Sequence, residues 1–297
     1  MMLGTMRIGA AVVALALTGS ASAQLDPPSW TTPTPAFRIV GPIWYVGTQG
    51  LSVYLIKTRA GAILIDGTLA DNVPAIRRNV EAAGVAMRDV KLLLNSHAHF
   101  DHAAGLAGLK AASGARLLAG AADKPALDSG IPPGEVSYGV IAFPAVRVDR
   151  AVRDGERVRL GEVTLTAHAT PGHTPGNTSW SMRVVDAKVN GGRPLSVLFP
   201  GSLNVAGNRL VGNKRYPGIV ADFRRSLARL AAMKADVVLP GHPEAADVIG
   251  RGARAAAGEK GAFLAPALMA QTTAAAAKAF EVELAKQEAA ASPSSRP

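Results

Sequence analysis

Short apolar runs separated by glycines dominate the chain after a proline-rich lead at residues 27–35. Runs of this length, rich in β-branched residues and bounded by turn formers, predict strands rather than helices. They occur in three early segments, in one run just before residue 95, and again in the middle and late parts of the chain. The predicted strands are 43–46, 52–58, 62–66, 90–94, 157–160, 163–170, 179–185, 196–199 and 236–239.

Helical spacing is visible in three places. Residues 73–83 predict a helix that Gly84 ends, and apolar residues recur at helical spacing over 220–230. The alanine-rich segment 265–291 contains strong helix formers and predicts a C-terminal helix on the surface, followed by a frayed end at 292–297. Helices that alternate with strands in this way indicate an α/β protein.

The two parts of the chain resemble each other. In each, a predicted helix is followed by a buried strand, 90–94 or 236–239, and then by a histidine at the C-terminal end of that strand. The internal similarity is weak, but it predicts two related halves whose ligand-bearing loops lie on one edge of the fold.

The start of the chain has the layout of a secretory signal peptide. A short positive stretch (1–7) precedes an apolar stretch (8–18), and small residues at 21–23 form a cleavage site. We therefore expect export to the periplasm, cleavage after Ala23 and one mature domain over 24–297; a buried N-terminal helix is the alternative. The apolar stretch is too short for a stable membrane anchor, and the absence of cysteine excludes lipid attachment at the cleavage site.

The composition narrows the possible chemistry. Of the 297 residues, 48% are apolar and 18% are charged, which is ordinary for a folded protein. The formal charge is +10, and the basic residues are scattered rather than grouped in a long run. This charge fits a solvated surface or the steering of an anionic small molecule, and it does not support nucleic-acid binding. Because the chain has no cysteine, any metal must be held by histidine, aspartate or glutamate.

The sequence N-S-H-A-H-F-D-H at residues 95–102 contains three of the six histidines in the chain. His97 and His99 are two apart at the end of a predicted strand, where alternate side chains point the same way, and Asp101 and His102 follow just past the turn. Imidazole and carboxylate groups without thiolate suit zinc among the common metals. The cluster therefore predicts a metal site, with a polar strand end rich in imidazole as the alternative.

Two more histidines lie in tight loops framed by glycine and proline. His173 lies in T-P-G-H-T-P-G after the predicted strand 163–170, and His242 lies in P-G-H-P-E after the predicted strand 236–239. Such framing holds a histidine in a rigid loop, and a histidine that merely fills a core does not need it. We expect both to bind metal, and we expect the sixth histidine, His168, to be an ordinary strand residue.

These three motifs resemble the metallo-β-lactamase superfamily, and they span most of the predicted mature chain. The resemblance implies a four-layer αββα sandwich with metals in a groove at one edge between the two sheets. Asp66, in L-I-D-G-T, matches an aspartate of the superfamily that supports the ligand loops; a plain turn residue is the alternative. The superfamily includes β-lactamases, thioester hydrolases such as glyoxalase II, lactone hydrolases and nucleases, so the fold alone does not decide the function.

Position 202 separates the members of the superfamily. Thioesterases and lactonases typically carry an aspartate there that bridges both metals, and the commonest β-lactamases carry a cysteine. This chain has Ser202, in L-F-P-G-S-L-N, and together with His102 it resembles the third subgroup of class B β-lactamases. Two positions depart from the pattern: Gly201, where members often have aspartate, and Asn204, where some members have a serine near the substrate carboxylate.

The resemblance implies two zinc ions. The implied ligands of the first are His97, His99 and His173, and those of the second are Asp101, His102 and His242. A metal-bound hydroxide would open the amide bond of penicillins, cephalosporins or carbapenems and so confer antibiotic resistance, with Asp101 also orienting the nucleophile. Ser202 and Asn204 would hydrogen-bond the substrate carboxylate, or would serve only their own loop.

Two other functions fit less well. A lactonase of the same fold is opposed by the missing bridging carboxylate and by the signal peptide. A zinc-binding protein without catalysis would close its coordination shells with protein ligands, whereas two sites with three ligands each leave positions open. The chain has no G-x-S-x-G motif, so a serine nucleophile has no support. We expect a monomer that acts on a small-molecule β-lactam.

Overall fold

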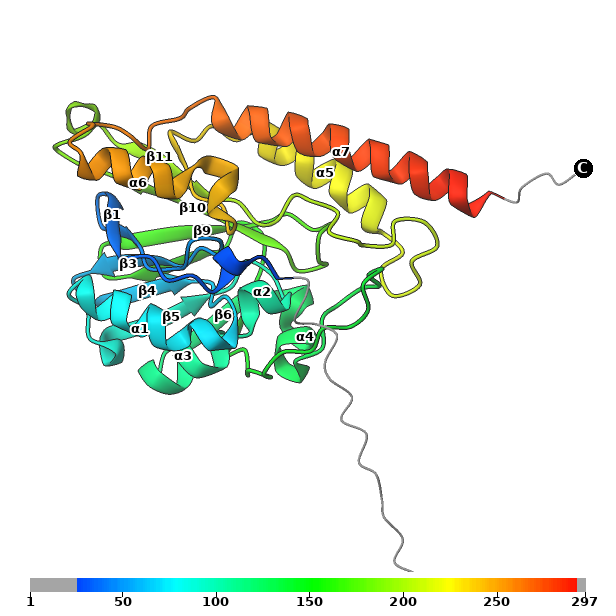
Figure 1. Cartoon of the computed structure of the whole chain (residues 1–297), viewed down its shortest axis with the longest axis horizontal. Helices are drawn as coiled ribbons and strands as arrows, with labels where there is room; N and C mark the ends of the chain where they lie inside the picture. Colours follow the sequence, from blue (N-terminus) through cyan, green and yellow to red (C-terminus); the bar gives the residue numbers. More distant parts are fainter. Residues whose placement is uncertain (1–25, 293–297) are drawn as a thin grey trace, which may run out of the picture.

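Two β-sheets pack face to face, and helices cover the outer face of each, which gives the four layers of an αββα sandwich (Figure 1). This computed structural model describes residues 26–292. The predicted signal peptide (1–23) and most of the predicted frayed end lie outside the described residues. Among the described residues, no helix is long and apolar enough to cross a membrane.

The first sheet has seven strands in the order in which they follow along the chain. They are β1 (Phe37–Val40), β2 (Ile43–Tyr45), β3 (Tyr54–Thr58), β4 (Gly61–Ile65), β5 (Val90–Leu94), β6 (Arg116–Gly120) and β7 (Arg150–Val152). Strands β1 to β4 pair antiparallel, whereas β4, β5, β6 and β7 pair parallel. A parallel pair needs a long crossover connection, and α1 (Val73–Ala82) supplies it between β4 and β5.

The second sheet has five strands in the order β12-β11-β10-β9-β8. They are β8 (Arg157–Leu160), β9 (Val163–Ala169), β10 (Thr178–Val184), β11 (Leu195–Phe199) and β12 (Val237–Val238). All neighbours are antiparallel except β11 and β12, which α5 (Ile219–Ala232) connects. Both halves therefore contain a strand-helix-strand unit whose second strand leads into a histidine loop, as the sequence predicts.

The remaining helices are shorter, apart from the last. They are α2 (Phe100–Ala103), α3 (Leu106–Ser113), α4 (Lys124–Ser129), α6 (Val248–Ala256) and α7 (Leu268–Ala291), with short 3-10 turns at Pro28–Trp30, Ala70–Asn72, Met87–Asp89, Ala121–Asp123, Asn190–Gly192 and Pro243–Ala246. The C-terminal helix is longer than any other described helix, and it lies along α5 on the outside of the second sheet (Figure 1). Phe280 of α7 is buried against Phe223 of α5, with 5.0 Å between the ring centroids.

Apolar side chains of both sheets fill the space between them. Trp180 of β10 is fully buried there, and its Nε1–H donates to the carbonyl of Asn95, 3.3 Å away, at the start of the histidine loop. A second apolar cluster fills the space between the seven-stranded sheet and the helices α1 and α3. The core thus reaches the loop that carries the candidate ligands.

Truncation of Trp180 tests this core. Trp180→Ala removes a large buried side chain and leaves a buried carbonyl without its donor, so we expect the free energy of unfolding to fall by about 3–5 kcal/mol. Chemical denaturation in excess chelator measures the loss without a contribution from bound metal. Trp44→Ala is the control, because Trp44 of β2 is only half-buried; a loss at Trp44 as large as that at Trp180 would contradict the assignment.

Candidate metal centre

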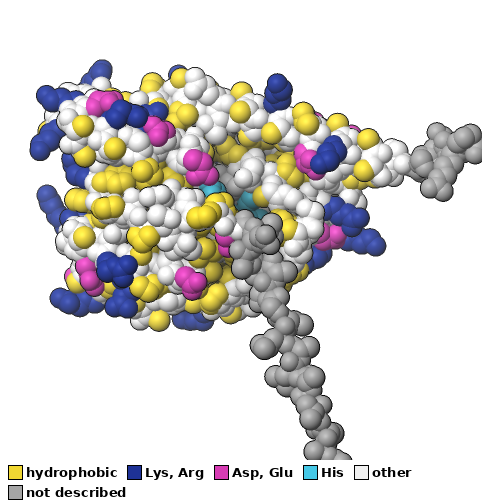
Figure 2. Space-filling model, in the orientation of Figure 1, with side chains coloured by type: hydrophobic (Ala, Val, Ile, Leu, Met, Phe, Trp, Pro, Cys, Tyr) yellow, Lys and Arg dark blue, Asp and Glu magenta, His cyan; other side chains and the backbone are white. Residues whose placement is uncertain are grey.

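The candidate ligands lie in loops that follow the C-terminal ends of strands from both sheets. His97 and His99 follow β5, His173 follows β9 and His242 follows β12. Asp101 and His102 lie in α2, one turn past the first pair. Figure 2 shows histidine side chains at the bottom of a hollow in the surface. The structure therefore brings together all six residues that the sequence predicts as ligands.

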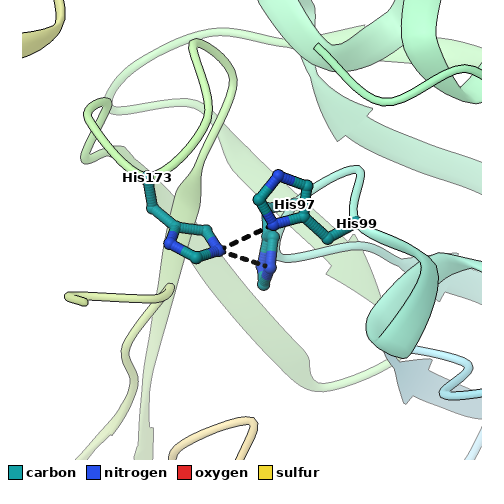
Figure 3. Close-up of side chains that lie close together, drawn as sticks. All are labelled: His97, His99 and His173. Atoms are coloured by element: carbon teal, nitrogen blue, oxygen red, sulfur yellow. Dashed lines mark hydrogen bonds between the residues drawn. The ribbon is translucent and has the colours of Figure 1, made fainter. Parts of the chain in front are cut away.

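Three imidazoles form the first group (Figure 3). Nε2 of His173 lies 3.1 Å from Nε2 of His97 and 2.9 Å from Nδ1 of His99. All three side chains are buried. Burial holds the pKa of His97 and of His173 well below the usual range and lowers the pKa of His99 to about 4. The three rings are therefore neutral at pH 7, which is the form that binds a metal.

The outer hydrogen bonds of two of these rings decide where their protons are. Nδ1–H of His173 donates to the carbonyl of Asn204 at 2.8 Å. The hydroxyl of Ser96 donates to Asp66 at 2.7 Å and accepts from Nδ1–H of His97 at 3.0 Å. The Nε2 atoms of His97 and His173 then face each other with a lone pair on each.

A cation fits this group because the two Nε2 lone pairs that repel each other would both be attracted to it. His99 directs Nδ1 toward the same point, and its Nε2 has no hydrogen-bond partner within residues 26–292, so the ring is free to offer Nδ1 as the third ligand. Three neutral imidazoles that converge on one point are the donor set of catalytic zinc sites with an open position.

Asp101, His102 and His242 form the second group. Oδ2 of Asp101 lies 3.3 Å from Nε2 of His102 and 3.2 Å from Nε2 of His242, and these two nitrogens are 3.2 Å apart. His97 also lies close to Asp101 and His102, so the two groups adjoin. One carboxylate and two imidazoles are ligands that zinc accepts.

Charge in the second group is shared between Asp101 and His102. Burial opposes ionisation of Asp101, but the charge of His102 and hydrogen bonds from His102 and His242 hold its pKa well below the usual range. Burial also lowers the pKa of His102, but Asp101 and Asp66 together raise it to about 10. A cation that binds Nε2 of His102 must therefore displace a proton.

Asp66 supports both groups from behind. It is buried at the end of β4, with φ of +65°, a conformation that aspartate tolerates better than most residues. Oδ1 accepts from the Ser96 N–H at 2.7 Å and from the Asn95 side chain at 3.1 Å. Oδ2 accepts from the Ser96 hydroxyl and, at 3.3 Å, from Nδ1–H of His102. This position is more than that of a plain turn residue, because it orients a ring in each group.

Asp123 is a supporting residue that could not be predicted from the sequence pattern. It is fully buried, and its carboxylate accepts from the N–H of Ala98 at 2.9 Å, from the hydroxyl of Thr174 at 2.6 Å and from the N–H of Gly176 at 2.7 Å. Burial raises the pKa of Asp123 to about 6, although these hydrogen bonds lower it. The available signal was an aspartate just after a short apolar run that ends at Gly120.

Ser202 and Asn204 line the same pocket as His99, Asp101, His173 and His242. The N–H of Ser202 donates to the Asn177 side chain at 3.0 Å, and its hydroxyl donates to Oδ1 of Asn204 at 3.2 Å.

His168 lies apart from the site in β9, half-buried, with Nε2 2.7 Å from the hydroxyl of Ser181. Its position is that of an ordinary strand residue.

A groove of about 930 Å³ runs from the two groups along α7, and an adjoining pocket of about 360 Å³ opens toward Tyr138 and Ile141. Both are lined by Trp30, Ser202, Asn204 and His242. The C-terminal helix is on the surface, as predicted, but it also forms one wall of the groove, which the sequence analysis did not predict. The hollow is large enough for a small-molecule substrate.

A sequence model described as "Metallo-beta-lactamase superfamily" matches residues 46–188. The structure is similar to that of BJP-1, a subclass B3 metallo-β-lactamase of Bradyrhizobium japonicum, with a TM-score of 0.84, 45% identity, and coverage of 89% of this chain and 99% of that chain. The chain belongs to the metallo-β-lactamase superfamily. Native FEZ-1 of Legionella gormanii is 36% identical, with a TM-score of 0.80 and coverage of 87% and 98% of the two chains. The predicted superfamily and αββα fold are thus confirmed.

Curated hydroxyacylglutathione hydrolases are also similar to this chain, but the similarity covers a smaller share of their length than it does for the two solved structures. The Rhodospirillum rubrum protein is 32% identical over 130 residues, which are 43% of this chain and 41% of that protein. The Pseudomonas paraeruginosa protein is 32% identical over 165 residues, which are 55% and 52% of the two. The match spans about half or less of the length of these relatives.

Removal of one ligand from each group tests the two donor sets. His173→Ala leaves the first group with two ligands, and His242→Ala does the same to the second, so we expect each variant to retain about one zinc ion fewer per chain than the unmutated protein. Elemental analysis after gel filtration measures the ratio of zinc to protein. His168→Ala is the control and should keep the full content; equal zinc content in all four proteins would exclude both donor sets.

Proposed function

We propose that the protein is a zinc-dependent β-lactamase that opens the amide bond of β-lactam antibiotics. The observation that carries the proposal is the composition of the second group: His102 lies beside Asp101 and His242, and a serine, Ser202, occupies the position that distinguishes the subgroups. BJP-1, a subclass B3 metallo-β-lactamase, and the metallo-β-lactamase FEZ-1 support the same interpretation, because this chain covers almost the whole length of each.

The residues divide the work between metal binding and orientation. His97, His99 and His173 would hold one ion, and Asp101, His102 and His242 the other. Bound zinc lowers the pKa of a water ligand to about 7 and polarises a carbonyl oxygen. Asp101 would bind the second ion through Oδ2. Its other carboxylate oxygen can accept a hydrogen bond from the attacking water and so orient that water toward the substrate.

The substrate carboxylate would bind on the wall that Ser202 and Asn204 form. Ser202 donates to Oδ1 of Asn204 in the structure, which leaves the Asn204 amide N–H groups pointing away from that bond. The Asn204 amide can donate to a carboxylate in the groove, and the Ser202 hydroxyl can do so when it rotates away from Asn204. The apolar side chains of Trp30 and Ile141 line the adjoining pocket and would contact the apolar part of a substrate.

Hydrolysis of hydroxyacylglutathione thioesters is the second candidate, and the curated relatives favour it. The missing carboxylate at position 202 opposes it, because thioesterases of the superfamily typically carry a bridging aspartate there.

We further propose that residues 24–297 form the mature domain, that it acts in the periplasm as a monomer, and that its activity confers antibiotic resistance.

Hydrolysis of a substrate panel decides between the candidates. The purified mature protein is assayed with a penicillin, a cephalosporin, a carbapenem, a hydroxyacylglutathione thioester and an acyl-homoserine lactone, each with and without chelator. We expect β-lactam hydrolysis that chelator abolishes and zinc restores. A higher kcat/KM for the thioester or the lactone than for every β-lactam would overturn the proposal.

Ser202→Ala and His102→Ala should have different effects. Loss of one hydrogen bond to a charged group costs roughly 1.5–3 kcal/mol, so Ser202→Ala should lower kcat/KM by about ten- to a hundred-fold at most, mainly through KM, and keep its zinc. His102→Ala removes a ligand, so it should lose the second ion and show a lower kcat. Steady-state kinetics with metal analysis measures both; a zinc lost from Ser202→Ala and kept in His102→Ala would reverse the assignment.

A further inference from the structure

The first group depends on how two loops from different sheets approach each other. His97 and His99 lie in the loop after β5 of the seven-stranded sheet, and His173 lies in the loop after β9 of the five-stranded sheet. A backbone hydrogen bond of 2.8 Å from Thr178 to Ser96 joins the loops on one side. Between the ligand residues themselves, the connection is made by the carboxylate of Asp123.

Each hydrogen bond that Asp123 accepts comes from a residue next to a ligand or close to one. Ala98, which donates at 2.9 Å, lies between His97 and His99. Thr174, which donates its hydroxyl at 2.6 Å, follows His173 directly, and Gly176 donates its N–H at 2.7 Å. The bond to Ala98 and the bond to Thr174 share the oxygen Oδ2, so a single atom links the two loops next to the ligand residues.

Asp123 occupies the N-cap position of α4, but it does not cap that helix. Its side chain makes no hydrogen bond to the first turn, which is the usual role of an aspartate at this position. The carboxylate is turned instead toward the two ligand loops. The close approach of the two loops also requires glycine at position 176, because a Cβ there would lie 2.6 Å from Cβ of Asp123.

We propose that Asp123 is a positioning residue that sets the separation between His173 and the pair His97 and His99, and thereby the affinity and geometry of the first metal ion. The inference rests on the proposed metal-dependent function, but it concerns binding of the ion and not turnover. A carboxylate is needed because both of its oxygens accept hydrogen bonds, and two accepting oxygens can receive all three donors at once. An amide at this position would direct an N–H group at one of those donors.

Asp123→Asn tests the proposal with almost no change in volume. We expect the first zinc ion to bind about 10- to 100-fold more weakly, which is the usual effect of losing a partner behind the ligands. Competition with a chromophoric chelator measures the affinity, and the visible spectrum of the cobalt-substituted protein reports the ligand geometry. The spectrum of the first site should change, and the affinity of the second ion should stay close to that of the unmutated protein.

Asp236→Asn is the matched control. The Asp236 carboxylate also accepts a backbone N–H and a hydroxyl, both from Ser196 at 2.7 Å, but it joins the starts of β11 and β12, at the ends opposite the ligand loops. Both variants lose the same kinds of hydrogen bond, and thermal unfolding of the metal-free proteins compares their stability. A first-site affinity that is unchanged in Asp123→Asn, or that falls as much in Asp236→Asn, would overturn the proposal.

Thr174→Val gives an independent test if Asp123→Asn does not fold. It removes one donor to Asp123 and keeps the shape of the side chain, so it should weaken the first ion in the same direction by a smaller factor. An unchanged affinity and an unchanged cobalt spectrum would then reject the proposal. Because the readout is metal affinity, a protein that binds two zinc ions and fails to open β-lactams would refute the proposed function and leave the role of Asp123 standing.

Discussion

Two ring nitrogens whose lone pairs face each other at close range repel, so the surrounding structure must hold the two rings in place. Nε2 of His97 and Nε2 of His173 are 3.1 Å apart, and the hydrogen bonds on the far side of each ring leave both without a proton. The fixed partners behind the rings, Asp66 through Ser96 and the carbonyl of Asn204, keep this arrangement in place. The Nδ1–H groups of both rings are hydrogen-bonded, which limits the cost of burying them, and the result is a site organised to receive a cation.

Three neighbouring parallel strands place the supporting groups side by side. Asp66 follows β4, the loop of His97 follows β5 and Asp123 follows β6, and these strands are adjacent in the seven-stranded sheet. The carboxyl ends of parallel strands share one edge of a sheet, which is where ligands bind in open α/β folds. The second sheet contributes His173 after β9 and His242 after β12 at the facing edge. Strand order, more than local sequence, therefore brings residues distant in the chain into contact.

Elements with strong apolar patterns could be predicted from the sequence, and the predicted strand bounds at 90–94 and 157–160 agree with β5 and β8. Strands β1, β6 and β7 were not predicted, because pairing with neighbouring strands, rather than their own residues, defines them. The candidate ligands stand out in the sequence because five of its six histidines lie in the 95–102 cluster or in glycine- and proline-framed loops. Asp123 could not, because one aspartate after an apolar run looks like a helix cap, and its true partners are separated from it by 25 to 53 positions.

The walls of the groove come from less regular parts of the chain than the ligands do. Trp30, Tyr138 and Ile141 lie outside the sheets, and α7 supplies the long wall. This wall is joined to the metal centre, because Gln287 of α7 donates to the carbonyl of Asn208 at 3.1 Å and Asn208 donates to the carbonyl of His173 at 3.0 Å. Ligands fixed at strand ends can keep one chemistry while such walls change, so members of one superfamily can share a metal centre and differ in substrate. For this reason we expect the residues that line the groove to contribute to substrate preference together with the composition of the second group.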